Sequence, residues 1–386
     1  MNSPPALPLP LGLYIHLPWC VRKCPYCDFN SHHSPAVLPE QAYLSALLAE
    51  LARYEEAYSY RPLESIFFGG GTPSLFSAGF IQQVLDTVAG RWNLAGDIEI
   101  TLEANPGTVE AGKFLGFRQA GVNRLSIGIQ SFDEISLVRL GRIHGREQAL
   151  SAVDTAISAG FSNFNLDLMF GLPGQSLAQG LADLDTALSL SPPHLSWYQL
   201  TLEPNTLFHK YPPQLPEDEA IWLLQQGGLV RLAEAGYEQY EVSAHARDGF
   251  RSRHNLNYWQ FGDYIGIGAG AHGKLTDPAT GTITRTRTIR HPEHYLACSE
   301  QQPERLIQTE EVAVGQRTAE FLMNHLRLRQ GFDLALYQTR TGLPESTLEP
   351  GLAACIANGL LEREGSGIRC TSQGWNFLDD VLQRFL

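Results

Sequence analysis

The sequence is poor in cysteine and has no long apolar run. Six cysteines among 386 residues are too few for the disulfide frameworks that hold small secreted domains together. No run of about 18 or more apolar residues occurs, so no transmembrane helix is expected. The first ten residues carry neither a basic segment nor a long apolar stretch, so no secretory signal is expected. We therefore expect a cytoplasmic protein, in which thiols stay reduced.

Basic residues are also scarce. The chain has 28 lysines and arginines against 41 acidic residues, and its formal net charge is −13. Such a chain is a poor general ligand for the phosphates of DNA or RNA, so we expect no nucleic-acid partner. Two arginine-rich stretches are candidate pockets for an anionic ligand, and solvated loops explain them about as well. They contain Arg247, Arg251 and Arg253, and Arg285, Arg287 and Arg290.

Half of the cysteines lie in one short segment. Cys20, Cys24 and Cys27 follow one another with the spacing C-x3-C-x2-C. Three thiolates can hold an iron–sulfur cubane and leave its fourth iron open to another ligand. A zinc site is an alternative, with His32 or His33 as the fourth ligand. A thioredoxin-like redox pair of Cys24 and Cys27 is another, but it leaves Cys20 without a role.

Strand-like and helix-like segments alternate through the first two thirds of the chain. Strands are expected at 11–16, 65–68, 98–102, 124–129, 163–169 and 194–200, and helices at 39–57, 77–91, 109–120, 146–159, 181–190 and 218–235. This alternation predicts an α/β fold with βαβ units, a parallel sheet and a partial, TIM-like (β/α)6 barrel. Active sites of such barrels lie at the C-terminal ends of the strands. The cysteine segment, residues 69–72, Glu103, Gln130 and Asp167 all fall there.

The pattern changes after residue 238. We expect a strand at 239–243, then a polar edge hairpin or loop at 276–292. Helices are expected at 310–328, 332–338, 348–358 and 375–386, with a short hairpin at 365–371. This order is typical of a small helical or winged-helix-like module. We therefore expect a core domain of residues 1–300 and a C-terminal helical domain of residues 301–386.

Polar and glycine residues at the strand ends have the chemistry of a ligand site. The triple glycine at 69–71 lets the backbone approach a ligand closely. Carboxylates such as Glu103 and Asp167 suit sugar hydroxyls or an ammonium group, and Arg142 suits a carboxylate. A structural ion pair inside the barrel mouth is the alternative for these charges.

A second candidate site follows the barrel. A neutral histidine such as His254 is a common axial ligand of heme iron, and Tyr258 and Trp259 could stack on a porphyrin face. The alternative for a single histidine is an ordinary hydrogen-bonded residue of the core or the surface.

Six sequence motifs together are highly specific for one protein family. They are LYIHLPWC at 13–20, FGGGTPS at 68–74, EANPG at 103–107, RLSIGIQSF at 124–132, NLDLMFGLPG at 165–174 and HNLNYW at 254–259. Through them the chain resembles the oxygen-independent coproporphyrinogen III oxidase family of radical S-adenosylmethionine (SAM) proteins over nearly its full length. Within that family it is most similar to the heme chaperone branch.

The resemblance implies a role for each matching residue. The ligands of a [4Fe–4S] cluster would be Cys20, Cys24 and Cys27. The residues around SAM would be Tyr14 near the cofactor, Gly70, Gly71 and Thr72 at its methionine end, and Glu103, Gln130, Arg142 and Asp167 as polar contacts. The resemblance also favours a heme site at His254, Tyr258 and Trp259.

Two departures separate the chain from the oxidases of that family. The oxidases carry a further cysteine two positions after the third cluster cysteine, where this chain has Phe29, and they have a longer N-terminal segment. The expected function is therefore that of a chaperone that binds heme and passes it to an unidentified acceptor protein. Its electron donor would be a protein such as a flavodoxin or ferredoxin. The alternatives are oxidative decarboxylation of coproporphyrinogen III and another radical SAM modification of a small molecule.

Overall fold

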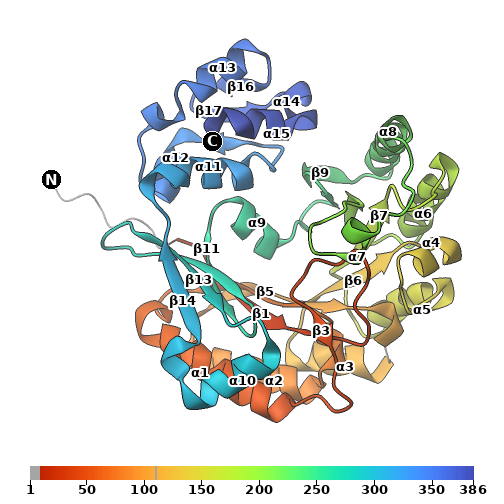
Figure 1. Ribbon diagram of the computed structural model, residues 1–386, viewed down its shortest axis with the longest axis vertical. Helices are drawn as coiled ribbons and strands as arrows, with labels where there is room; N and C mark the ends of the chain where they lie inside the picture. The colour runs from red at the N-terminus through yellow and green to blue at the C-terminus, as the bar shows by residue number, and fades with distance from the viewer. Residues whose placement is uncertain (1–8, 109–110) are drawn as a thin grey trace.

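Six parallel strands form the centre of the structure, which is a computed structural model that describes residues 9–108 and 111–386. They pair in chain order, and Figure 1 shows them as one curved sheet. They are β1 (Leu11–Leu17), β4 (Leu63–Gly70), β5 (Leu94–Ala104), β6 (Arg124–Gln130), β7 (Phe164–Phe170) and β8 (His194–Gln199). The predicted α/β class and partial (β/α)6 barrel are confirmed.

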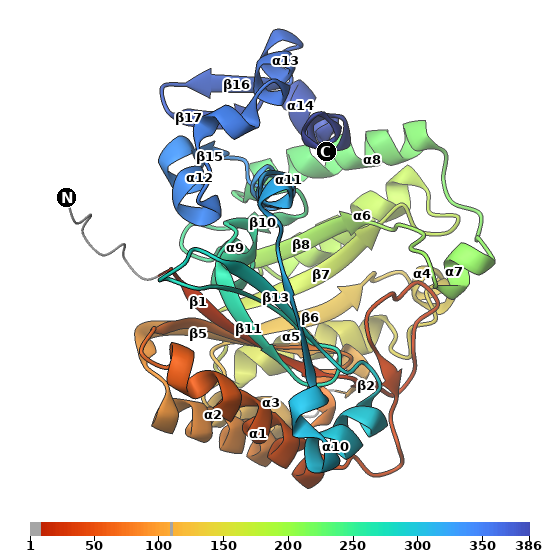
Figure 2. The same cartoon turned by 60° about the vertical axis from the view of Figure 1, so that its left-hand side comes forward.

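Helices cover the outside of this sheet (Figures 1 and 2). They are α1 (Glu40–Tyr58), α2 (Ala78–Arg91), α3 (Ala111–Ala120), α5 (Arg146–Ser158), α6 (Leu177–Ser189) and α8 (Asp218–Glu234). Strands β1 and β6 are buried almost throughout, as expected where both faces are covered. The predicted helix at 109–120 starts outside the described residues. Helix α6 begins a turn earlier than predicted because Ser176 and Gln179 form a capping box, a signal that the apolar pattern does not contain.

Short strands extend the sheet on both sides to twelve strands. On the β8 side these are β10 (Ala244–Ala246) and β9 (Glu238–Glu241), and on the β1 side β11 (Asp263–Ile267), β12 (His272–Thr276), β13 (Ile283–Thr288) and β14 (Ile307–Glu311). The hairpin expected at 276–292 is therefore not at the edge, because β14 pairs outside β13. The helix predicted at 310–328 was wrong at its start, since Glu310 and Glu311 belong to β14.

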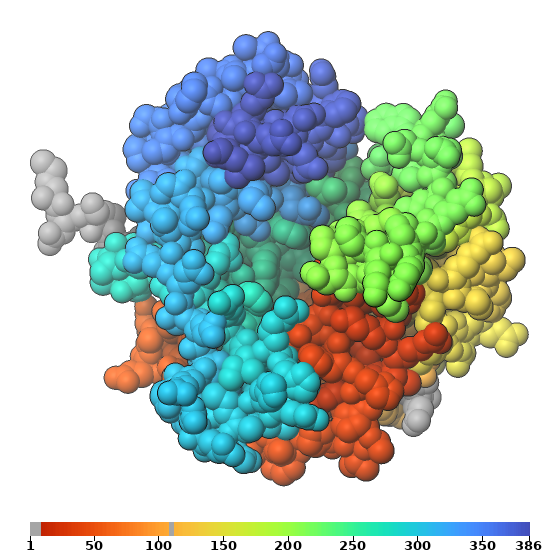
Figure 3. Space-filling view, in the orientation of Figure 1, coloured from red at the N-terminus to blue at the C-terminus, as the bar shows by residue number. Residues whose placement is uncertain are grey.

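The C-terminal region forms a separate layer at one end of the molecule, drawn in blue in Figure 3. It contains α11 (Val314–His325), α12 (Leu334–Thr341), α13 (Gly351–Ala357), α14 (Ser372–Asn376), α15 (Leu378–Leu382) and a small sheet of β15 (Phe332–Asp333), β16 (Leu361–Glu364) and β17 (Gly367–Cys370). Helices and a hairpin around the buried Phe321 and Tyr337 have a winged-helix-like arrangement. Strand β14 lies in the large sheet although it follows the predicted boundary at residue 300.

Smaller elements complete the fold. They are β2 (Trp19–Cys20), β3 (His32–His33), α4 (Glu134–Arg139), α7 (Leu207–Lys210), α9 (Arg253–Trp259) and α10 (Pro292–Gln301), with 3-10 turns at Pro73–Leu75, Pro106–Thr108, Pro303–Arg305, Glu345–Leu348 and Gln383–Phe385. Among the residues described, no helix combines the length and the apolar character that a membrane span requires.

A buried ion network joins β11 to its neighbours. Asp263 lies 2.9 Å from Arg61 Nη1 and 3.0 Å from Lys274 Nζ, and all three side chains are almost fully buried. Burial alone would raise the pKa of Asp263, but Lys274 and then Arg61 hold it below its ordinary value. The charged carboxylate therefore depends on both cations.

Replacing Lys274 with methionine should lower the free energy of unfolding by about 3 kcal/mol, because one cation is removed from a buried carboxylate. Chemical denaturation at pH 7 measures the change. Asp263 stabilises the wild type above its unfolded pKa of about 3.9, and this contribution is lost as the pH falls through the lower folded value. The exposed Lys210 provides the control, since Lys210→Met should change stability little. Equal effects of the two substitutions would contradict the prediction.

Candidate cofactor-binding site

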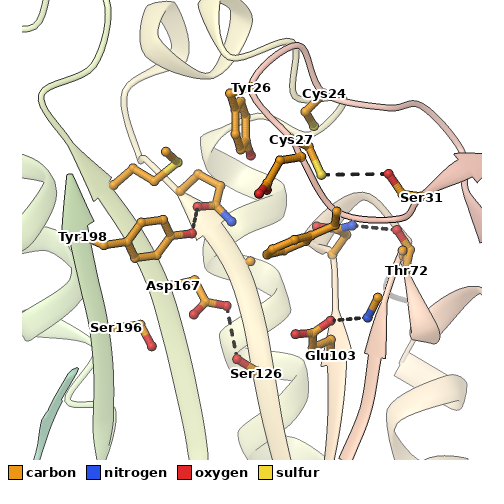
Figure 4. A pocket seen from close by; sticks show the side chains of 18 of the residues that line it. Cys24, Tyr26, Cys27, Ser31, Thr72, Glu103, Ser126, Asp167, Ser196 and Tyr198 are labelled. Atoms are coloured by element: carbon orange, nitrogen blue, oxygen red, sulfur yellow. Dashed lines mark hydrogen bonds between the residues drawn. The ribbon is translucent and has the colours of Figure 1, made fainter. Parts of the chain in front are cut away.

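A cavity of about 510 Å³ opens at the C-terminal ends of the barrel strands. Figure 4 shows the cysteine loop at one side of it and the strand ends at the other. Eleven of the fourteen predicted site residues line it: Cys20, Cys24, Cys27, Gly70, Gly71, Thr72, Glu103, Gln130, Arg142, Asp167 and Trp259. Residues spread over 240 positions of the sequence are thus brought together, because parallel strands end at the same edge of a barrel.

The cysteine loop is closed at its base by a two-stranded parallel pairing. Strands β2 and β3 align Trp19 with His32 and Cys20 with His33. Within the loop, Cys27 N donates to Cys24 O at 3.2 Å, and Pro25 O accepts from the backbone of α7 at 3.0 Å. The backbone therefore holds the three thiols at the cavity by contacts at the base, inside the loop and from a neighbouring helix.

Each thiol has a different polar neighbour. Thr72 Oγ1 donates to Cys20 Sγ at 3.4 Å, Arg142 Nη1 donates to Cys24 Sγ at 3.7 Å, and Cys27 Sγ lies 3.9 Å from a serine hydroxyl. Burial raises the pKa of Cys20 and of Cys27, and the Thr72 hydrogen bond partly offsets the effect at Cys20. Donors of this kind stabilise metal-bound thiolates, so the residues present fit a cluster held by three cysteines.

The alternatives for the loop have less support in the geometry. All six cysteines are free thiols, including Cys24 and Cys27. Among the described residues, no group of three or more His, Cys, Asp or Glu side chains is placed to hold a metal ion. His32 points instead to Asn30 Oδ1 at 3.1 Å and packs its ring against His291. A single zinc ion requires all of its ligand atoms to lie around one point. In a cubane each thiolate binds a different iron, so the three sulfur atoms can lie further apart.

Asn105 was missed by sequence reasoning and connects two of the thiol neighbours. Its Nδ2 donates to Thr72 Oγ1 at 2.9 Å, and its Oδ1 accepts from Arg142 Nη2. The same guanidinium donates to Gly128 O at 2.7 Å. A hydrogen-bonded path therefore runs from Cys24 through Arg142, Asn105 and Thr72 to Cys20. The available signal was the position of Asn105 just after the end of β5, two residues beyond Glu103.

The glycine turn after β4 is fastened to the cysteine strand. Gly71 N donates to Leu17 O and Thr72 N to Trp19 O, both at 2.8 Å, and Gly70 N donates to Glu103 Oε2 at 3.1 Å. A Cβ on Gly71 would lie 2.6 Å from the Trp19 carbonyl oxygen, and Gly70 has φ +115°, a conformation that favours glycine. With these N–H groups occupied inside the protein, the turn would meet a ligand through its carbonyl oxygens.

Two carboxyl groups face the cavity, Glu103 from β5 and Asp167 from β7, with β6 between these strands (Figure 4). Burial, reinforced by the charge of Asp167, raises the pKa of Glu103 to about 8. Burial also raises the pKa of Asp167, although hydrogen bonds from Asn165 Nδ2 at 2.8 Å and Ser126 Oγ at 3.1 Å oppose it. Two such carboxyls in one cavity favour a cationic ligand, which would lower both pKa values.

Gln130 ends β6 in an unusual backbone conformation. It has φ 70°, and the pairing with β7 shifts register between Gly128 and Gln130. Non-glycine residues with positive φ are uncommon and concentrate at functional sites. Its Oε1 accepts from the hydroxyl of Tyr198 at 2.8 Å, and Tyr198, which sequence reasoning missed, also lines the cavity.

Three predicted residues lie outside the cavity lining. His254 is 4% exposed, its Nδ1 is 3.2 Å from Ser65 Oγ, and its ring stacks on Phe67 with centroids 4.7 Å apart. The Tyr14 ring lies against both of these rings, with its centroid 6.2 Å from that of His254 and 6.2 Å from that of Phe67. Tyr258 packs on Tyr264 at 4.0 Å. Burial lowers the pKa of His254 to about 3, so its imidazole is neutral. Its heme role stays a prediction.

Of the three predicted heme residues only Trp259 lines the cavity, together with Asn255 of the same helix. The guanidinium of Arg327 lies 4.4 Å from its ring centroid and also 3.2 Å from Glu241 Oε2. Arg327 follows α11, and its backbone O accepts from Val242 N at 3.1 Å. The C-terminal region therefore supplies part of the cavity wall, which no local sequence pattern indicated.

Comparison with known proteins places the chain in a family. It matches the Radical SAM superfamily over residues 14–186 and the HemN C-terminal domain over residues 316–377. The protein named heme chaperone HemW of Haemophilus influenzae is 49% identical over 386 residues, which cover 99% of each chain. The chain belongs to the HemW family. The family member of Escherichia coli is 50% identical and that of Bacillus subtilis 33%, over 98% and 97% of this chain and 98% of each relative.

A solved structure agrees with the fold of this HemW family member. Coproporphyrinogen III oxidase (HemN) from Escherichia coli superposes with a TM-score of 0.82 at 21% identity, over 98% of this chain and 90% of that chain. At this identity the likeness concerns the fold alone. Membership of the radical SAM group implies a [4Fe–4S] cluster and SAM, and the donor set of the cavity fits both.

Proposed function

We propose that this protein is a heme chaperone that binds heme and transfers it to an acceptor protein, on a radical SAM scaffold. The observation that carries the proposal is the full-length similarity, at 49% and 50% identity, to two proteins named heme chaperone HemW. The exposed Phe29 in place of a further loop cysteine also favours it over the oxidase. The proposed setting is the cytoplasm, where thiols for iron stay reduced.

In this proposal Cys20, Cys24 and Cys27 hold the cluster, and Thr72 and Arg142 donate to the first two thiolates. When bound, the cluster and SAM together supply one-electron cleavage of a carbon–sulfur bond. The turn at Gly70 and Gly71 would meet the SAM ammonium through carbonyl oxygens. The strand-end polar groups then orient the rest of SAM. The candidate polar contacts are Tyr14, Glu103, Gln130, Arg142 and Asp167, of which Tyr14 acts from behind the lining.

Binding of SAM should release a proton from Glu103. The carboxyl group has its pKa raised to about 8, so at pH 7 it is mostly protonated in the free site, and a cationic ligand shifts it to the charged form. Calorimetry in two buffers of different ionisation enthalpy measures the release, which should approach about one proton near pH 7 and vanish well above pH 8. Glu103→Gln should bind SAM with less release; unchanged proton release in Glu103→Gln would contradict the assignment.

The heme side of the proposal involves α9. Trp259 offers an aromatic face in the cavity, whereas His254 is packed behind it against Phe67 and Ser65. Ligation of heme iron by His254 therefore requires α9 to move away from β4. Helix α9 spans seven residues, so few intrahelical hydrogen bonds would have to break in such a movement.

Heme titration tests this part. The Soret band of added heme should shift with wild-type protein, and the shift should weaken in His254→Ala and in Trp259→Ala. His245→Ala is the matched control, because His245 is also buried and has no hydrogen-bond partner for its ring. An unchanged spectrum in His254→Ala would remove that residue from the heme site.

Anaerobic incubation with coproporphyrinogen III, SAM and a reductant tests the function itself. We expect no protoporphyrinogen IX, and we expect transfer of bound heme to an added apo-acceptor such as an apocytochrome. Formation of protoporphyrinogen IX would overturn the chaperone proposal in favour of the oxidase.

A further inference from the structure

Four exposed cations lie beside the cysteine loop of a chain whose net charge is −13. Two belong to the loop, Arg22 and Lys23. Of the other two, Arg287 lies in β13 and Arg290 follows that strand. We call these four residues the basic loop face. Figure 3 looks onto this side, where the red N-terminal segment lies against the teal segment that contains the hairpin. The clustering is unusual because charge of the opposite sign prevails elsewhere.

Direct contacts place the two segments together. Asn30 Nδ2 donates to Ala269 O and to Arg290 O, both at 2.9 Å. The rings of His32 and His291 are 5.1 Å apart. After burial, the positive groups that lower the pKa of His32 include His291, Lys23 and Arg290. The two segments thus form one continuous surface beside the loop.

The cations of the basic loop face lack carboxylate partners. Within the described part of the chain none of the four forms a salt bridge, whereas the neighbouring Arg285 pairs with Glu320. Lys23 Nζ donates to backbone carbonyls of the loop, and Arg287 Nε donates to a glutamine. Two exposed carboxylates, Asp28 and Glu293, are also near, so the face keeps an excess of positive charge.

Apolar side chains are exposed in the same loop. Val21, between Cys20 and Cys24, is 43% exposed. Phe29, just after Cys27, is 61% exposed. An apolar centre with a charged rim is the usual composition of a protein-binding surface. Here the rim is basic, so the matching partner is acidic.

We propose that the basic loop face docks a small acidic flavoprotein that reduces the cluster. The inference rests on the proposed function, in which the cluster needs one electron from outside. The carrier is oxidised by one electron and the cluster is reduced by one, with no bond made or broken. Electron transfer falls steeply with distance, so the carrier must dock on the surface nearest the three cysteines. The exposed, apolar edge of a flavin ring suits contact with Phe29.

Charge reversal tests the proposal on the full-length protein. The triple variant Arg22→Glu/Arg287→Glu/Arg290→Glu leaves Lys23, which holds the loop. At low salt, reduced flavodoxin should reduce the cluster of this variant at least about ten-fold more slowly than the cluster of the wild type. Added salt should slow the reaction of the wild type only. Binding of oxidised flavodoxin to the cluster-free protein should weaken by a similar factor. Arg287→Glu/Arg290→Glu, outside the loop, should show a smaller change in the same direction.

Two controls separate this proposal from the proposed function. Dithionite should reduce the cluster equally fast in all variants, and Arg118→Glu/Arg384→Glu, which changes two exposed cations elsewhere, should behave as the wild type with flavodoxin. Absence of a cluster that dithionite can reduce means that the proposed function fails. A normal cluster with equal flavodoxin rates in all variants overturns the docking surface alone. Dependence on these residues with a ferredoxin but not with flavodoxin overturns the choice of a flavoprotein.

Discussion

Cys24→Ala should prevent assembly of the iron–sulfur cluster. With one of three thiolates removed, anaerobically reconstituted protein should fall from about four irons per chain to a small fraction of that and lose its brown visible absorbance. Cys24 is the thiol that Arg142 contacts, so its loss also removes one end of the hydrogen-bonded path to Thr72. Iron and sulfide analysis together with the visible spectrum measure the effect.

The matched control is another cysteine of the same chain. Cys298 lies on α10, where its thiol donates to Gln302 O, and Cys298→Ala should retain the full iron content. A normal cluster in Cys24→Ala would contradict the assignment of Cys24 as a cluster ligand. Zinc in the wild type, retained with tetrahedral thiolate coordination, would point to the alternative metal site instead.

Gly71→Ala should weaken SAM binding by roughly ten-fold or more. The added Cβ would lie 2.6 Å from the Trp19 carbonyl oxygen, a backbone atom that cannot move without shifting the strand that carries Cys20. Clashes of this kind cost about 1–3 kcal/mol, and about 1.4 kcal/mol corresponds to a factor of ten in affinity. Equilibrium binding of SAM to the reconstituted protein measures the change.

Gly90→Ala provides the comparison within the same βα unit. Gly90 lies in α2, where a Cβ meets nothing within 4 Å, so alanine should raise stability by about 0.5–1 kcal/mol and leave SAM binding unchanged. Equal SAM affinity in Gly71→Ala and the wild type would show that the turn does not position SAM.

The strand–helix alternation and the cysteine spacing were both readable in the sequence. Each depends on local order: apolar periodicity predicts a strand or a helix, and the ends of parallel strands necessarily share one edge. For that reason Glu103, Gln130 and Asp167 could be assigned to the same cavity as the cysteines. The sequence pattern wrongly predicted a helix at Glu310 and Glu311, because strand pairing with β13 outweighs helix preference there.

Only the tertiary structure decided which side chains face the cavity and which pack behind its lining. His254 and Trp259 share one short helix, yet Trp259 faces the cavity while His254 packs against Phe67. Arg327 reaches the same cavity from the C-terminal region, where it meets Trp259 and Glu241. Such placements depend on packing between residues distant in the sequence, and neither periodicity nor motif spacing contains that information.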